Sequence, residues 1–229
     1  MKKIFTLIVI LSVVFIACKN NNQDKQAEDT LDLDALRRDT MSAIQGDSAA
    51  ITGSSGISVN AENAIISYSN SVLEAIQNKD YKKLSTYIDP TQGVVFSPYS
   101  YVDKDVLKNN HFTKQSIISF GESDAKKTWG YADGSGDPIN MSMEQYIDRF
   151  VYDNNFLHVK DIKANESLFR KSNGVDNSLT VFPEKTFVDY YKKPKEGETE
   201  FDWSNLRLIF NKEGNNLYLI AVVHNQWQI

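Results

Sequence analysis

Aromatic side chains, which carry much of the buried area in a protein core, occupy only part of this chain. Apart from two near the N-terminus, every aromatic residue lies at or after Tyr68. The stretch before it, residues 18–58, is rich in Asn, Asp, Gln, Ser and Gly. Such a composition cannot bury enough apolar area to offset the entropy lost on ordering the chain. The sequence therefore predicts a flexible tether over residues 18–58 and one folded domain over residues 59–229.

The first residues have the three parts of an export signal. Two lysines precede an uncharged, mostly apolar run, residues 4–16, which is followed by the small residue Ala17 and then Cys18. This order of a basic, an apolar and a small-residue region is typical of a secretory signal peptide. A transmembrane helix is the alternative, but it needs about 20 apolar residues, and this run is shorter. Residues 1–17 are therefore predicted to be a signal peptide that is removed.

Cys18 is the only cysteine of the chain, so it has no disulfide partner. Its position directly after Ala17 resembles the lipobox of bacterial lipoproteins. The resemblance implies that Cys18 becomes the lipidated N-terminus. Acyl chains such as palmitate would then hold the protein to the lipid bilayer of a cell envelope, in the periplasm or exposed on the surface. The alternative is ordinary signal cleavage with a free thiol, but a lone exposed cysteine has no structural use in an oxidising compartment.

The exported part is acidic and has no basic surface for nucleic acid in its sequence. Removing residues 1–17 takes away two lysines and no acid, so the formal charge changes from −5 to −7. The short lysine clusters at residues 82–83 and 192–195 are not interleaved with aromatic residues, as a nucleic-acid surface would be. Nucleic acid is therefore not an expected partner. Because the domain contains no cysteine, zinc–thiolate sites and cysteine nucleophiles are excluded from it.

Apolar periodicity predicts helices at the start of the domain and strands towards its end. Residues 61–76 repeat at the spacing of one helical face, with Asn60 as N-cap, and a second short helix begins at Asp80 and ends before Pro90. A third helix is predicted over residues 143–152, with Ser142 and Gln145 spaced as a capping box. Extended segments are expected at residues 94–102, 115–120, 156–162, 186–191, 206–210 and 217–223.

The last two of these strands flank residues 211–215, a Gly-containing turn that suits an antiparallel hairpin. Residues 217–223 are apolar on both faces, so this strand is expected inside the sheet under a second layer. Helices followed by antiparallel strands indicate the α+β class. The stretch at residues 75–84 resembles the opening of the cone fold named after nuclear transport factor two. That resemblance implies N-terminal helices packed on a curved antiparallel sheet.

A second resemblance covers the whole domain. It is carried by the residues Gly-Val-Val-Phe-Ser-Pro-Tyr at 93–99, by Trp-Gly-Tyr-Ala-Asp-Gly-Ser-Gly-Asp-Pro-Ile at 129–139, and by residues 150–153 and 224–229. In these segments the chain is similar to a family of secreted bacterial lipoproteins. The resemblance implies export and anchoring, but it brings no activity with it.

Histidine is the first residue type to consider for proton transfer near neutral pH. The chain has three, His111, His158 and His224, and no two of them have the spacing of a metal site or a catalytic triad. We therefore expect surface or hydrogen-bonded histidines. The aromatic residues Tyr99, Tyr101, Trp129 and Tyr131 are candidates for lining a cone pocket. The alternative is that these rings fill the core.

Residues 133–137 resemble part of a calcium-binding loop. Oxygen-bearing side chains alternate at Asp133, Ser135 and Asp137, and Glu144 lies eleven positions after the first of them, as in an EF-hand loop. Against calcium, Pro138 stands where that motif requires Gly. The alternative is a tight glycine turn without metal. No other cofactor is expected.

Two functional hypotheses remain. The first is a membrane-anchored lipoprotein whose domain binds a small molecule or a protein without catalysis. The second is a cone-pocket hydrolase or isomerase that uses carboxylate and tyrosine groups. A deep pocket with a buried carboxylate near a tyrosine would favour the enzyme, and a filled cone would favour the binding protein.

Overall fold

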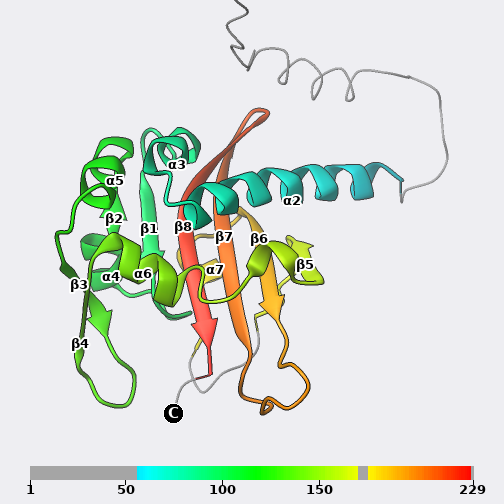
Figure 1. Cartoon of the computed structure of the whole chain (residues 1–229). Helices are drawn as coiled ribbons and strands as arrows, with labels where there is room; N and C mark the ends of the chain where they lie inside the picture. Colours follow the sequence, from blue (N-terminus) through cyan, green and yellow to red (C-terminus); the bar gives the residue numbers. More distant parts are fainter. Residues whose placement is uncertain (1–55, 170–174, 228–229) are drawn as a thin grey trace, which may run out of the picture. The chain divides into compact units, whose positions relative to one another are not determined.

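A computed structural model describes residues 56–169 and 175–227, where a six-stranded sheet carries helices on both faces (Figure 1). The helices are α2 (Gly56–Gln77), α3 (Tyr81–Tyr87), α4 (Lys104–Asn109), α5 (Lys114–Gly121), α6 (Met143–Phe150) and α7 (Ser178–Val181), with a 3-10 turn at Phe156–His158. The strands are β1 (Val94–Ser97), β2 (His111–Phe112), β3 (Lys127–Tyr131), β4 (Pro138–Met141), β5 (Asp161–Ala164), β6 (Thr186–Lys192), β7 (Ser204–Glu213) and β8 (Asn216–Gln226). The predicted α+β class is confirmed.

The predicted signal peptide and residues 18–55 of the predicted tether lie outside the described residues. Helix α2 begins at Gly56, three residues before the predicted start of the domain at residue 59. Asn60, expected as its N-cap, is therefore inside the helix. Within the described ranges, no helix is both long enough and apolar enough to cross a bilayer.

The sheet is centred on β8 and β7, the last two strands of the chain. Its order is β2-β1-β8-β7-β6-β5, and β3 with β4 forms a separate hairpin. Neighbouring strands run antiparallel except β1 and β8, which are parallel, with Val95 opposite Ala221 and Ser97 opposite Val223. The expectation of an antiparallel sheet is therefore correct for every pair but this one.

The hairpin predicted between the last two strands is confirmed. Strands β7 and β8 are joined through Gly214, whose φ of 60° lies in the left-handed region that suits glycine at a tight hairpin turn. As expected from its apolar run, β8 lies inside the sheet, between β1 and β7. Residues Leu219 to Val223 are all buried.

Successive residues of the long strands contact two different hydrophobic clusters. On one face, Leu206 and Leu208 of β7 pack with Ile76 of α2 and with side chains of α3 and α6. On the other face, Ile209 of β7 and Val223 of β8 pack with side chains of α4 and α7. Because side chains alternate across a strand, a strand covered on both sides must be apolar at successive positions. This explains the uninterrupted apolar run of β8.

Aromatic rings fill the space between β1, β3 and α6. Trp129 stacks on Tyr146 with ring centroids 3.8 Å apart, and Phe96 meets both rings edge-on. Phe112 and Phe150 extend this cluster. Such ring pairs contribute about 0.5–1.5 kcal/mol each beyond the area they bury. The interior between these elements is therefore occupied by side chains.

The starts of α3 and α6 were predicted correctly, and a polar side chain caps the first turn of each. The Asp80 carboxylate accepts a hydrogen bond from the backbone N–H of Lys83 and begins α3. At α6 the predicted capping box is confirmed. Ser142 Oγ accepts from the N–H of Gln145 at 3.3 Å, and Gln145 Oε1 accepts from the N–H of Ser142 at 3.1 Å.

Three expected strands differ from the structure. Residues 115–120, predicted as a strand, belong to helix α5, which begins at a capping box between Thr113 and Ser116. The segment 156–162 is a 3-10 turn followed by β5, which starts only at Asp161. The segment 94–102 ends as a strand at Ser97, directly before Pro98. The hairpin of β3 and β4 was not predicted, because its strands have only five and four residues and show no clear apolar alternation.

Gly93 should be more sensitive to substitution than Gly214, although both have positive φ. A Cβ at Gly93 would lie 2.5 Å from His111 Nε2 and from the Phe112 carbonyl oxygen, whereas a Cβ at Gly214 meets nothing within 4 Å. We expect Gly93→Ala to lower the free energy of unfolding by about 2–4 kcal/mol and Gly214→Ala by about 1–2 kcal/mol. Urea unfolding of both variants tests this. Equal losses would show that the close approach of the added Cβ to β2 does not lower the stability further than the positive φ alone.

Candidate functional site

One buried polar cluster gathers groups that are far apart in the sequence. His224 of β8 and Ser204 of β7 are buried, and Asp153, in the turn after α6, has a side chain only 13% exposed. The carbonyl group of Pro98, directly after β1, completes the set. We call these four groups the His224 cluster. It joins four parts of the fold, namely the end of β1, the end of β8, the start of β7 and the turn after α6.

Hydrogen bonds define the protonation of the imidazole. The Pro98 carbonyl oxygen lies 3.2 Å from Nδ1 of His224, and because a carbonyl only accepts, Nδ1 carries a proton. Nε2 lies 3.3 Å from Ser204 Oγ and 3.4 Å from Asp153 Oδ2. Ser204 Oγ also donates to Asp153 Oδ2 at 3.1 Å. Nε2 therefore faces both the Ser204 hydroxyl and the Asp153 carboxylate.

These residue types are those of a serine hydrolase, but their geometry is different. In a catalytic triad the carboxylate orients one ring nitrogen and the serine faces the other. Here Asp153 and Ser204 both face Nε2 of His224. The serine and the imidazole are also almost fully buried, so a substrate carbonyl has no approach to them. The arrangement fixes strands together and is not that of a triad.

The surroundings of Asp153 favour its charged form. Burial alone would raise the pKa of this carboxyl, but the hydrogen bond and charge of His224, with hydrogen bonds from Ser204 and Asn154, hold the pKa below its ordinary value. The second oxygen, Oδ1, is buried and has no hydrogen-bond partner among the described residues. The charged form of this carboxylate is therefore stabilised by the contacts of Oδ2.

A second buried cluster surrounds the fully buried Arg207 of β7. Its Nε and Nη2 donate to the two oxygens of Asp189 on β6, at 2.6 and 2.7 Å. The remaining N–H groups donate to Asp176, Ser178 and Ser167. The guanidinium also lies over the rings of Phe169 and Phe187, 3.9 and 4.9 Å from their centroids. We call Arg207 with its four polar partners the Arg207 cluster.

Every donor of the Arg207 guanidinium is thus engaged, and the cluster binds the segments around Ser167 and Ser178 to the sheet. Burial raises the pKa of the Asp189 carboxyl, while two hydrogen bonds and the charge of Arg207 act in the opposite direction. An arginine stays protonated in proteins, so we assign an ionised pair at neutral pH. With no donor left over, the cluster has nothing to offer a ligand.

The four predicted pocket residues do not surround one cavity. Trp129 is 1% exposed and belongs to the core, as the alternative expectation held. Tyr99 packs edge-on against Phe150, and its hydroxyl accepts from the backbone N–H of Asp133. Tyr101 and Tyr131 are 55% and 67% exposed, and Tyr101 borders a hollow.

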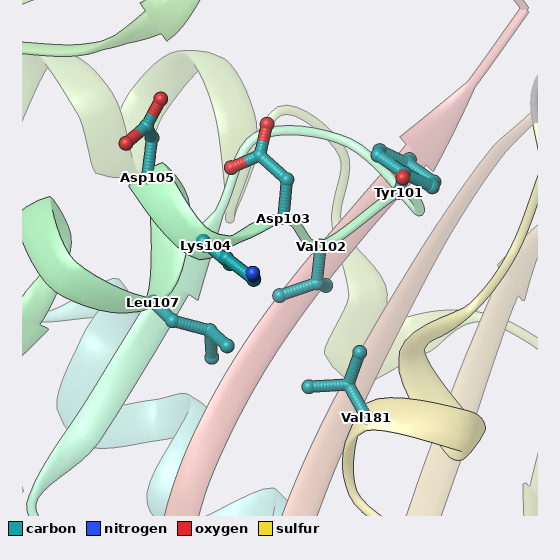
Figure 2. Close-up of a pocket in the computed structure, with 7 residues that line it drawn as sticks. All are labelled: Tyr101, Val102, Asp103, Lys104, Asp105, Leu107 and Val181. Carbon is teal, nitrogen blue, oxygen red and sulfur yellow. The ribbon is translucent and has the colours of Figure 1, made fainter.

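That hollow is an open depression of about 430 Å³ at the start of α4, which we call the Tyr101 hollow (Figure 2). Ligand sites in proteins have volumes of about 300–1,000 Å³. Its lining residues come from the loop after β1, from α4 and from α7: Tyr101, Val102, Asp103, Lys104, Asp105, Leu107 and Val181.

The predicted calcium ligands do not meet either. Asp133 Oδ1 accepts from the N–H of Gly134, and Ser135 Oγ accepts from the N–H of Asp137, so these oxygens stabilise the turn between β3 and β4. Glu144 lies on α6, beyond the whole length of β4, and forms an ion pair with Lys79 at 2.8 Å. Within the described part of the chain, no three His, Cys, Asp or Glu residues lie close enough to hold a metal ion.

Two signals in the sequence could have located the Arg207 cluster. Arg207 and Asp189 are charged residues within strands that are otherwise largely apolar, and such a residue requires a partner. His224 gave no such signal, because its partners lie about 20, 70 and 125 positions away along the chain and only the fold brings them together.

The His224 cluster, the Arg207 cluster and the Tyr101 hollow stand out among the described residues. In comparisons with protein families, curated proteins and solved structures, nothing matches this chain. Each site is therefore judged from its own geometry. The two clusters are closed by their own hydrogen bonds, whereas the hollow is open to solvent. The hollow is the candidate binding site.

Breaking the Arg207 cluster on one side should cost more than replacing both charges. Arg207→Met leaves the buried Asp189 carboxylate without its cation, and we expect the free energy of unfolding to fall by about 3–5 kcal/mol. The double variant Arg207→Met with Asp189→Leu should recover part of that loss, because no buried charge remains unpaired. Denaturant unfolding of both proteins measures this. A double variant less stable than the single one would contradict the interpretation.

Asp153 should stabilise the fold in a pH-dependent way. Because the pKa of its carboxyl is lower in the folded state, its contribution is present above the ordinary aspartate pKa and is lost as the pH falls through the folded value. Asp153→Asn should therefore lower the free energy of unfolding by about 1–3 kcal/mol at pH 6 and by less at pH 3. Urea unfolding at both pH values tests this, with the exposed Asp124→Asn as control. The same loss at both values would refute the assignment.

Proposed function

We propose that this protein is a lipoprotein of a bacterial cell envelope whose domain binds a small molecule or a protein without catalysis. The apolar run of residues 4–16 followed by Ala17 and Cys18 carries the anchoring part of the proposal. Acyl chains, palmitate among them, would hold Cys18 in the bilayer. The tether would leave the domain free in the periplasm or at the cell surface.

For the fold, we propose the cone architecture named after nuclear transport factor two. Support comes from the two opening helices, α2 and α3, whose side chains pack on one face of the sheet together with those of α6. Helix α2 runs across several strands in Figure 1. The mostly antiparallel strand order is compatible with such a cone.

The packed interior supports binding rather than the alternative hydrolase or isomerase. In the described part of the chain, Trp129 and Tyr146 stack between β1, β3 and α6, which supports a filled cone. The buried carboxylates of Asp153 and Asp189 are paired with His224 and Arg207, not with a tyrosine hydroxyl. The acidic formal charge supports a partner other than nucleic acid.

Changing Cys18 to Ala should block lipidation and leave unprocessed precursor. The wild-type chain should fractionate with membranes and lack a reactive thiol, because its only cysteine carries the lipid. Asn20→Ala, two residues further on, is the matched control and should behave as wild type. Membrane fractionation and mass spectrometry of the N-terminus measure both properties. A Cys18→Ala chain that is processed and fractionates like wild type would refute the anchor.

A further inference from the structure

The Tyr101 hollow is apolar at its base. Val102 is 2% exposed and belongs to the hydrophobic cluster on this face of the sheet, against which Leu107 and Val181 also pack. The ring of Tyr101 stands at its border and is 55% exposed, which is unusual for a large side chain in this domain. A ligand with an apolar body could therefore bury surface here without any rearrangement of the core.

A side chain outside the hollow holds its base in place. Asn177, directly before α7, accepts from the N–H of Val102 at 2.7 Å through Oδ1 and donates to the Val102 carbonyl at 3.0 Å through Nδ2. This paired contact connects the loop after β1 to α7, so the two sides of the hollow are held together. A site formed before the ligand arrives loses less entropy on binding.

The charged side chains at the border of the hollow differ in their contacts and in the direction in which they point. Asp103 Oδ1 accepts from the N–H of Val106 at 2.8 Å and caps α4. In Figure 2 the carboxylates of Asp103 and Asp105 point away from Val181, while Lys104 lies between Val102 and Leu107. Among the residues that the structure describes, none forms an ion pair or hydrogen bond with the side chain of Lys104. Its ammonium is therefore the charged group available above the apolar base.

We propose that the Tyr101 hollow binds a small organic acid with an apolar body. The acid's carboxylate pairs with Lys104, its body covers Val102, Leu107 and Val181, and the ring of Tyr101 closes one side. This inference deepens the proposed binding function and rests on it, since it names the ligand class of that domain. It does not depend on the lipid anchor.

Two probes of the same body and opposite charge test the ligand class. Titration calorimetry of the purified full chain with 4-phenylbutyrate should show saturable binding, with a Kd of about 0.1–1 mM, as expected for a ligand of this size. Binding of 4-phenylbutylammonium should be at least about tenfold weaker, because the carboxylates of Asp103 and Asp105 point away from the base, whereas Lys104 lies over it.

Variants of one helix locate the site. Lys104→Gln should weaken 4-phenylbutyrate binding at least about fivefold through loss of the charge-assisted contact. Lys108→Gln, which removes an equally exposed lysine of α4, should leave the Kd unchanged. Val181→Asp should abolish binding, and its circular dichroism and thermal unfolding show whether it is folded.

Three results would overturn the proposal: no saturable heat with 4-phenylbutyrate, equal binding of the ammonium probe, or equal effects of Lys104→Gln and Lys108→Gln. Each of them leaves the anchor untouched, because membrane fractionation of Cys18→Ala is a separate measurement. Conversely, an unlipidated chain that binds the acid would remove the anchor and keep the hollow. The two proposals therefore fail independently.

Discussion

Burial of β8 on both faces is the constraint on which the rest of the architecture depends. A strand that is apolar at successive positions cannot lie at a sheet edge or face water. It needs neighbours on both sides, which are β1 and β7, and a layer over each face. Helices α2, α3 and α6 provide one layer, and α4 with α7 provides the other. The Tyr101 hollow lies in the second, thinner layer, where short helices leave part of the apolar surface uncovered.

The first two helices, α6 and the central strands could be predicted from the sequence, because their signals are local. The apolar run at residues 217–223, the turn containing Gly214 and the cap at Ser142 each depend on residues a few positions apart. The helix α5 was misread as a strand because Ile117, Ile118 and Phe120 also suit a strand, and the cap at Thr113 was not taken into account. In the structure, Ile117 is the buried residue of α5, because a helix turns only one of its faces to the core.

The sites could not be predicted in the same way, because they depend on contacts between distant segments. Tyr101 and Val181 border one hollow, yet they are 80 positions apart, and Asn177 connects them through the backbone of Val102. The four aromatic residues near positions 99–131 were grouped by sequence proximity, and the sheet separates them into core and surface. Buried charges behave in the same way: Arg207 indicates that a partner exists, but only the register of β6 and β7 identifies Asp189.

The parallel pairing of β1 with β8 sets the order in which the domain can form. Val95 is opposite Ala221, so the first strand of the sheet receives this neighbour only when the last strand has been made. Contacts of such long sequence separation form slowly, because a large loop must close first. A chain that emerges with its N-terminus first therefore remains without a complete core until β8 has been made. A chain shortened by its last strand would lose the centre of its sheet rather than an edge.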